Sequence, residues 1–457
     1  MEIQPSNQKK RRFEKKDIQT VVKVAWPSAL ESFFVALAGI VDTYMVSNLS
    51  SSSVAAVGLT TQPKFLGLAP FLALKIAISS LVARRFGQKD RGKANSILVM
   101  GLIFTVLGSI IVSVLCVAFA EPIMWFVGAN EDTHAESVIY FRIIMGGMIF
   151  NTIQLAVNAA LRGVGNTKIA MRTNVTANVV NVIGNYLLIE GNLGFPALGV
   201  AGAALATVFG TVVACIMSIV SVFRRDSFVS MAYIIKNKIG VAMDQLDAMG
   251  KLMGSEFAEQ VIVRIGFLLT AMFAANLGTE AFAAHQVGMN LMSLSFAFGD
   301  GLSVAAVALI GKSLGEEKPE QAKNYGNICQ RFALCIALVM AVIFLFGGRG
   351  IYHLFFTEEE IINYGVQIAR IMIVIVLFQT SNVVYTGSLR GAGDMVYVMI
   401  TGMLSIAIFR PIVAYVLAYV CNLGVLGIWS GVLVDQGTRL MMTYSRYRSG
   451  KWTKIKI

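Results

Sequence analysis

The sequence predicts an all-α integral membrane protein of about twelve transmembrane helices, arranged as two six-helix lobes. Three observations predict this class. Hydrophobic residues make up 56% of the 457 residues, whereas charged residues make up only 14%. The apolar residues lie in blocks of roughly 20 to 30, each long enough to cross the hydrocarbon layer as a helix, and the chain repeats itself in two halves. A β-barrel would instead show alternation over about ten residues, which the sequence lacks.

Hydropathy places the spans along the chain. Their approximate ranges are 20–45, 54–83, 96–119, 136–161, 170–190, 198–223, 250–276, 281–311, 328–348, 362–388, 396–420 and 425–445. An even number of spans puts both termini on one side. Most of the 38 Lys and Arg residues fall in the two tails and in alternate loops, which is typical of cytoplasmic segments. We therefore expect a multi-pass protein of the cell membrane with both termini in the cytoplasm.

Over most of their length the two halves repeat at an offset of 228 residues (312 − 84), which is nearly half the chain. The motif Leu161-Arg162-Gly163-x-Gly165 returns as Leu389-Arg390-Gly391-x-Gly393, and Glu31 returns as Glu259. Because each half has an even number of spans, the copies share one orientation. They should be related by a pseudo-two-fold axis along the membrane normal, as in transporters that rock two lobes about a central cavity.

The repeat also sets the expected domains, which are a basic cytoplasmic tail, an N-lobe, a cytoplasmic linker, a C-lobe and a second basic tail. Their ranges are 1–19, 20–223, 224–247, 248–446 and 447–457. Within the linker we expect a helix at the membrane surface over residues 232–246.

Ionisable groups inside the bilayer are costly and mark candidate functional sites. Asp42 and Glu31 lie in the first span, eleven residues apart. Eleven helical steps turn about 20° beyond three full turns, so both carboxylates share one helix face. Pro27 precedes them and removes a backbone donor, which makes it a candidate bend.

The fifth span carries a polar stripe that could complete a site around Asp42. Asn178, Asn181 and Asn185 recur on one helix face, and Thr207 lies in the next span. Amide, hydroxyl and carboxylate oxygens are ligands that small hard cations prefer. The same carboxylate could carry a proton, and the asparagines could instead serve as hydrogen-bonding contacts between helices.

The second half offers a less complete set of charges. Glu259 in the seventh span is a secondary candidate for cation binding, and Arg264 is a candidate ion-pair partner for it. Further charges at membrane depth are Lys75, Asp300, Arg410 and Asp435, whose pairing the sequence does not specify. The three histidines and five cysteines show no metal-ligand spacing, so no metal site is expected.

Several of these features together resemble the MATE (multidrug and toxic compound extrusion) transporters. They are the paired LRGxG motifs, the FGQKD and KSLGEEK turns, Arg410-Pro411, the LGVxGAAxAT run at 198–207, and Pro27 with Val41-Asp42-Thr43. The resemblance implies that Asp42 is the principal coupling residue and Asn181 its partner. It places Asn185 where prokaryotic relatives often have an aspartate, and it places Glu259 at a glutamate that some members use for cation binding.

The expected function is export of cationic, amphiphilic small molecules by a secondary antiporter that is coupled to H⁺ or Na⁺. The alternative is a flippase or exporter of lipid-linked or polysaccharide precursors from the same superfamily. A channel or an enzyme is disfavoured, because the sequence shows neither a filter-like loop nor a catalytic or nucleotide-binding motif. We expect no cofactor and no nucleic-acid partner, since the net charge of +12 suits topology and lipid contact. Two lobes in one chain can work as a monomer.

Overall fold

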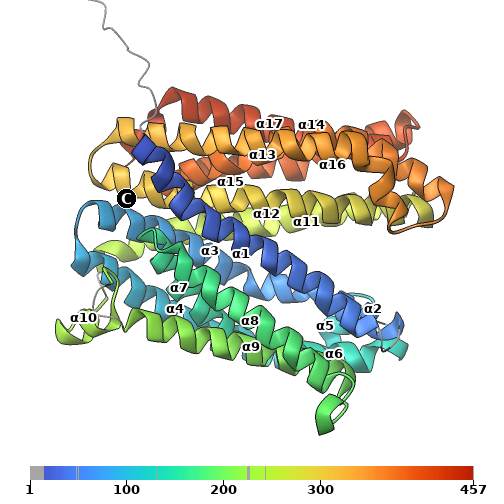
Figure 1. Ribbon diagram of the computed structural model, residues 1–457, viewed down its shortest axis with the longest axis horizontal. Coiled ribbons are helices and arrows are strands. Elements are labelled where there is room, and N and C mark those ends of the chain that lie inside the picture. Colours follow the sequence, from blue (N-terminus) through green and yellow to red (C-terminus); the bar gives the residue numbers. More distant parts are fainter. Residues whose placement is uncertain are drawn as a thin grey trace, which may run out of the picture.

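The computed structural model describes residues 15–47, 49, 51–129, 131–223, 227–241 and 243–455, and these residues form helices without a strand. Figure 1 shows two stacked groups of helices, one from each half of the chain. Most of the expected N-terminal tail and the start of the linker lie outside the described residues.

The first half supplies the helices of the N-lobe, drawn from blue to green in Figure 1. They are α1 (Lys15–Ser47), α2 (Ser51–Leu59), α3 (Thr61–Gly87), α4 (Arg91–Ala118), α5 (Ala120–Phe126), α6 (Glu131–Gly146), α7 (Met148–Gly163), α8 (Thr167–Leu188), a 3₁₀ turn (Asn192–Gly194) and α9 (Gly199–Val222). Helices α6 and α7 meet at a bend of 44° and together make one span.

The second half supplies the C-lobe. Its helices are α10 (Met231–Lys236), α11 (Met243–Ala275), α12 (Thr279–Gly315), α13 (Pro319–His353), α14 (Glu359–Ala392), α15 (Met395–Gly402), α16 (Arg410–Tyr415) and α17 (Val425–Ser449). π-helical stretches (Met403–Phe409 and Val416–Val420) join α15 to α16 and extend α16, so residues 395–420 make one span.

Twelve helical positions match the twelve expected spans. Within the described ranges, nine helices are long and apolar enough to cross a membrane, and the bent pair α6–α7 makes a tenth. The other two positions are α8 and α17, whose polar side chains, such as Asn181 and Asp435, lower their apolar content. The predicted all-α, two-lobe fold class is confirmed, and the weakest spans by composition are those that carry buried polar groups.

The first helix of each lobe packs against helices of both lobes. The first half of α1 places Val21 and Val24 in a cluster with α12, α13 and α14, whereas Val46 near its end packs with α6 and α9. Helix α11 does the reverse, since Met249 and Leu252 pack against α3 and α4 while its second half packs within the C-lobe. Figure 1 shows α1 crossing obliquely from one group of helices to the other.

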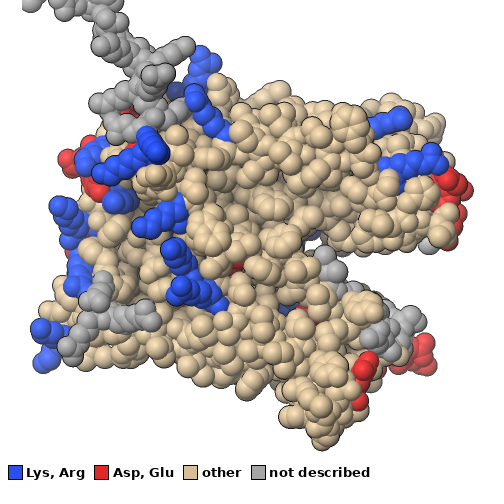
Figure 2. Space-filling model, viewed as in Figure 1, with Lys and Arg blue, Asp and Glu red and all other residues tan. Residues whose placement is uncertain are grey.

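The lobes meet tightly at one end and separate at the other. Gly87 ends α3 and Gly315 ends α12, and a Cβ atom built on Gly315 would lie 3.0 Å from the Cα of Gly87. These two glycines are equivalent in the repeat, so the pseudo-two-fold axis passes between them. Basic residues follow both helix ends, and Figure 2 shows Lys and Arg gathered mainly at this end. At the opposite end, Figure 2 shows a hollow between the lobes.

Two segments outside the bundle are notable, and the first corrects a sequence expectation. The helix expected over residues 232–246 is divided into α10 and the start of α11, because the chain turns at Lys238, which has a positive φ of 50°. The C-terminal segment is packed rather than extended into solvent. Trp452 is fully buried and donates from Nε1 to the Tyr447 carbonyl at 2.8 Å, and Arg84 donates to the Ile455 carbonyl at 2.9 Å.

The glycine contact at the closed end predicts a packing requirement. Gly87→Ala or Gly315→Ala should separate α3 from α12 and lower thermal stability, because overpacking a close backbone contact costs about 1–3 kcal/mol. Thermal unfolding of the purified protein measures the effect. Gly250→Ala is the matched control, since a Cβ there meets open space. Equal melting temperatures for all three variants would show that the contact is not constrained.

Candidate functional site

The N-lobe site forms where α1 faces α8. Asn185 donates from Nδ2 to Asp42 Oδ1 at 2.6 Å. The Asn181 amide lies between Asp42 and Thr207, and with its nitrogen turned toward the carboxylate it donates to Asp42 Oδ1 at 2.7 Å. In that orientation its oxygen lies 2.9 Å from Thr207 Oγ1. The structure therefore brings Asp42, Asn181, Asn185 and Thr207 together, as the stripe on the fifth span predicted.

Asn178 lies outside this site although it shares the stripe. Its side chain donates to the backbone carbonyl of Phe34 at 3.3 Å, two turns along α1 from Asp42. This contact ties α8 to α1 and leaves no amide for the Asp42 carboxylate. The hydrogen-bonding alternative therefore describes Asn178 better than the ligand interpretation does.

The Asp42 site offers several hard oxygen atoms and one carboxylate. The side-chain oxygen of Asn185 is buried and has no hydrogen-bond partner among the described residues. Together with the Asp42 carboxylate and the oxygens of Asn181 and Thr207, it suits a small monovalent cation or a proton. Within the described part of the chain, no group of three or more His, Cys, Asp or Glu residues could hold a metal ion.

Glu31 serves a second, separate cluster on the same face of α1. It forms an ion pair with Arg162 at the end of α7 and accepts a hydrogen bond from Asn174 on α8. Asn174 in turn accepts from Gln154 at 2.6 Å. Both charged side chains are at least nine-tenths buried, so each removes the electrostatic cost of burying the other.

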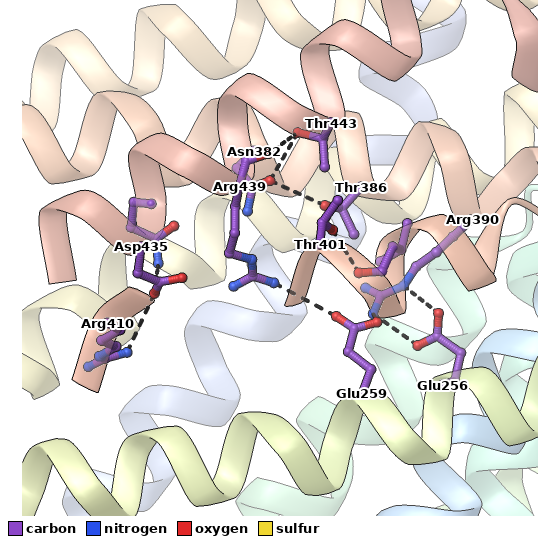
Figure 3. Close-up of polar contacts among 12 residues, drawn as sticks. Glu256, Glu259, Asn382, Thr386, Arg390, Thr401, Arg410, Asp435, Arg439 and Thr443 are labelled. Carbon is purple, nitrogen blue, oxygen red and sulfur yellow. Dashed lines mark hydrogen bonds and ion pairs between the residues drawn. The ribbon is translucent and has the colours of Figure 1, made fainter. Parts of the chain in front are cut away.

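The C-lobe contains the same ion pair at the equivalent positions, drawn in Figure 3. Arg390 donates to Glu259 at 2.8 Å, as the repeat offset of both residues requires. It also donates to Glu256 at 2.8 and 2.9 Å, so one guanidinium holds two buried carboxylates. Arg439 of α17 lies 3.7 Å from Glu259 on its other side.

The expected pairing of Glu259 with Arg264 is wrong. Arg264 instead places its guanidinium carbon 4.4 Å from the centre of the Phe65 ring on α3. Residues five apart turn about 140° around a helix, so the two side chains point to different faces of α11.

The charges in the C-lobe continue along α17 toward α16. Asp435 lies 3.6 Å from Arg410, and both side chains are almost wholly buried. The Arg410 guanidinium also lies 4.6 Å from the centre of the Phe267 ring. Figure 3 shows acids and guanidinium groups alternating from Glu256 to Arg410. The C-lobe therefore matches its buried acids with arginines, whereas Asp42 in the N-lobe is held mainly by neutral amides.

The LRGxG motif explains how each ion pair is placed. Its arginine meets the glutamate of the lobe's first helix, and the next glycine lets the helix end approach a neighbouring backbone. A Cβ on Gly163 would lie 2.7 Å from the Ser79 carbonyl oxygen, and one on Gly391 would lie 2.8 Å from that of Val307.

Pro27 lies inside α1, which continues as a helix through it. The backbone of α12 approaches closely just beyond this point, since a Cβ on Gly301 would lie 2.5 Å from the Ala29 nitrogen. Pro27 therefore lies within the part of α1 that packs on the C-lobe, about four turns before Asp42. Bending at this residue stays a prediction.

Sequence analysis missed the partners of the paired acids. The sequence shows Arg162 and Arg390 within a repeated motif, and Glu31 and Glu259 as a repeated acid. It does not by itself show that each arginine pairs with the acid of its own lobe. The available signal was that the glutamate and the arginine recur together at the same offset, which favours a contact between them. Asn174 had no such signal, because Gly402 stands at its equivalent position in the repeat.

Comparisons with known proteins agree with this architecture. The MatE family profile matches twice, over residues 27–187 and 257–416. The probable multidrug resistance protein NorM of Thermotoga maritima is 27% identical over 440 residues, covering 95% of this chain and 93% of that protein. The uncharacterized transporter YisQ of Bacillus subtilis is 24% identical over 433 residues, covering 95% and 94%.

Solved structures show the same fold. A multidrug resistance transporter of the MATE family, in an outward-facing conformation, superposes with a TM-score of 0.89 at 20% identity, covering 96% of this chain and 97% of that one.

The duplicated helical bundle and these matches define a multi-pass transporter of the cell membrane, and family members are transporters rather than enzymes. Since the profile matches more than half of its residues, this chain belongs to the MatE family. The membership expected from the motifs is confirmed.

The C-lobe ion pair predicts strong coupling between its partners. Arg390→Gln should destabilise the protein by about 3–5 kcal/mol, because it leaves two buried carboxylates without their cation. Adding Glu259→Gln should recover part of that loss, and thermal unfolding of the two single variants and the double variant measures the coupling.

Arg142→Gln is the control, since its 2.9 Å pair with Glu121 is exposed and should contribute about 1 kcal/mol or less. If the losses from Arg390→Gln and Glu259→Gln simply add, the two residues do not stabilise one another as the geometry requires.

Proposed function

We propose that this protein is an antiporter that exports amphiphilic small molecules in exchange for an inward-moving cation, either H⁺ or Na⁺, bound at Asp42. The observation that carries the proposal is the cluster of Asp42, Asn181, Asn185 and Thr207 inside the N-lobe. A carboxylate held by neutral amides keeps its charge available for an incoming cation. Membership of a family with multidrug resistance relatives supports efflux as the transport direction.

Helix α1 connects this site to the rest of the molecule. Its second half carries Asp42 against α8, and its first half packs in the C-lobe cluster through Val21 and Val24. A cation that displaces the Asn185 hydrogen bond changes how α1 is held against α8. Because the other end of α1 is fixed in the C-lobe, such a change alters the relation between the lobes. Cation binding therefore favours one arrangement of the lobes over the other, as coupling requires.

The two candidate coupling ions differ in the number of oxygen ligands that they need from the site. One carboxylate suffices for a proton, whereas Na⁺ also needs the amide and hydroxyl oxygens around it. The unpartnered Asn185 oxygen supports Na⁺, and the presence of Asn185 in place of a second acid supports H⁺. Separate gradients distinguish the two ions. The protein is proposed to act as a monomer among membrane lipids, since both lobes of the pathway come from one chain.

Efflux of a fluorescent cationic dye from cells or everted vesicles, driven by an imposed Na⁺ or proton gradient, tests this function. Asp42→Asn should lower gradient-driven transport at least tenfold, because it removes the single ionised group that the site offers the cation. Asp247→Asn, an exposed aspartate in the linker, is the matched control. Transport driven equally well by Asp42→Asn would refute coupling at this site, and no transport by the wild type would favour the lipid-precursor alternative.

The orientation of the chain is a separate prediction. The concentration of basic residues at the closed end supports an orientation in which that end faces the cytoplasm and the hollow faces the outside. In a cysteine-free background, Ser449→Cys should react with a membrane-impermeant maleimide only after permeabilisation. Glu131→Cys, exposed beyond the opposite end of the bundle, should react in intact cells. The reverse pattern would invert the topology.

A further inference from the structure

We propose that the interface between the lobes recognises an acidic group on the substrate, so that the preferred substrates are zwitterionic or anionic aromatic amphiphiles. The residues that carry this proposal are Arg264 on α11 and Lys64 with Phe65 on α3. It rests on the proposed function for the statement that the ligand is transported, but recognition itself can be measured by binding alone.

The two cations flank one aromatic ring at a junction of the lobes. The guanidinium carbon of Arg264 lies 4.4 Å from the centre of the Phe65 ring, and Lys64 Nζ lies 5.8 Å from the same centre. Helix α3 belongs to the N-lobe and α11 to the C-lobe, and the two helices pack against each other. All three side chains are partly exposed. A ligand bound here would therefore contact both lobes.

Arg264 differs from the buried arginines of the bundle because no described carboxylate lies within ion-pairing distance of it. Arg162 is paired with Glu31, Arg390 with two glutamates, and Arg410 with Asp435. A charge at membrane depth without a protein partner is costly, and such groups mark substrate pathways. Stacking on Phe65 uses the flat face of the guanidinium and leaves the N–H groups at its edge free to donate to a carboxylate.

Neither Asp42 nor Asp300 forms an ion pair with Arg264 among the described residues. Asp42 accepts from Asn185, and Lys64 lies close enough to exert an electrostatic influence on it. Asp300 on α12 accepts a hydrogen bond from Ser32 at 3.2 Å and interacts electrostatically with Lys75.

The competing explanation is that the contact between Arg264 and Phe65 only holds the lobes together. A cation–π contact contributes about 0.5–2 kcal/mol and would favour one lobe arrangement whatever the ligand. Its loss would change the binding of every substrate by the same factor. Recognition of an acidic group would instead change only the binding of ligands that carry the acid, so paired ligands separate the two explanations.

Tetramethylrhodamine and its methyl ester form the required pair, since they share one aromatic cation and differ in a free carboxylate. Binding to the purified full chain in lipid nanodiscs, measured by fluorescence anisotropy, should be tighter for the acid than for the ester. Arg264→Gln should weaken binding of the acid at least tenfold and leave the ester within about twofold, as expected for loss of a charge-assisted hydrogen bond. Lys64→Gln should act in the same direction.

Arg264→Lys should keep part of the preference because it keeps the charge, and Arg349→Gln, an exposed arginine paired with Glu359, should change nothing. Equal losses for the acid and the ester in Arg264→Gln, or tighter wild-type binding of the ester, would overturn the proposal.

Transport assays with the same two dyes separate this inference from the proposed function. Selective binding of the acid without gradient-driven efflux of either dye would refute the antiport function and support the site. Efflux of the cationic ester that depends on Asp42, with no preference for the acid, would support the function and refute the site.

Discussion

A carboxylate inside a membrane protein is stable only where a cation or several hydrogen-bond donors meet it, and this constraint organises both lobes. The ion pair between Glu31 and Arg162 recurs between Glu259 and Arg390 at the same offset. In each lobe it joins the first helix to the end of the fourth span. The glycine after each arginine then allows a close backbone contact with the second span. One duplicated charge pair thus fixes three helices of each lobe.

The two lobes differ at the position of the Asp42 carboxylate. The position equivalent to Asp42 in the C-lobe is Thr270, whose hydroxyl donates to the carbonyl of its own helix at Gly266. The C-lobe therefore has no carboxylate at this position, and its buried acids Glu256 and Asp435 lie beside arginines. A carboxylate already neutralised by arginine has little affinity left for a cation. This asymmetry supports a single coupling site, placed in the N-lobe.

The sequence predicted the spans, the duplication and the polar face around Asp42, because these depend on periodicity and on patterns within single helices. Asn181 and Asn185 lie against Asp42 as the stripe predicted, and Thr207 joins the cluster through Asn181. The predicted pairing of Glu259 with Arg264 was wrong, because residues five apart in sequence point to different faces of a helix. Arg439 and Lys64 could not have been assigned, since their neighbours depend on how separate helices pack. The packing of the C-terminal segment, in which Trp452 is buried, likewise depends on contacts between separate helices that the sequence does not specify.

The exchange of half-helices between lobes has a consequence for the origin of the fold. The start of α1 buries Val21 and Val24 in the C-lobe, and the start of α11 buries Met249 and Leu252 in the N-lobe. A single six-helix unit with this packing would expose one end of its first helix and lack the matching surface for its own core. Such a unit is complete only as a pair of identical chains, each lending a half-helix to the other. Joining two such chains turns an exchange between subunits into one within a chain, and leaves the two halves free to differ, as Asp42 and Thr270 do.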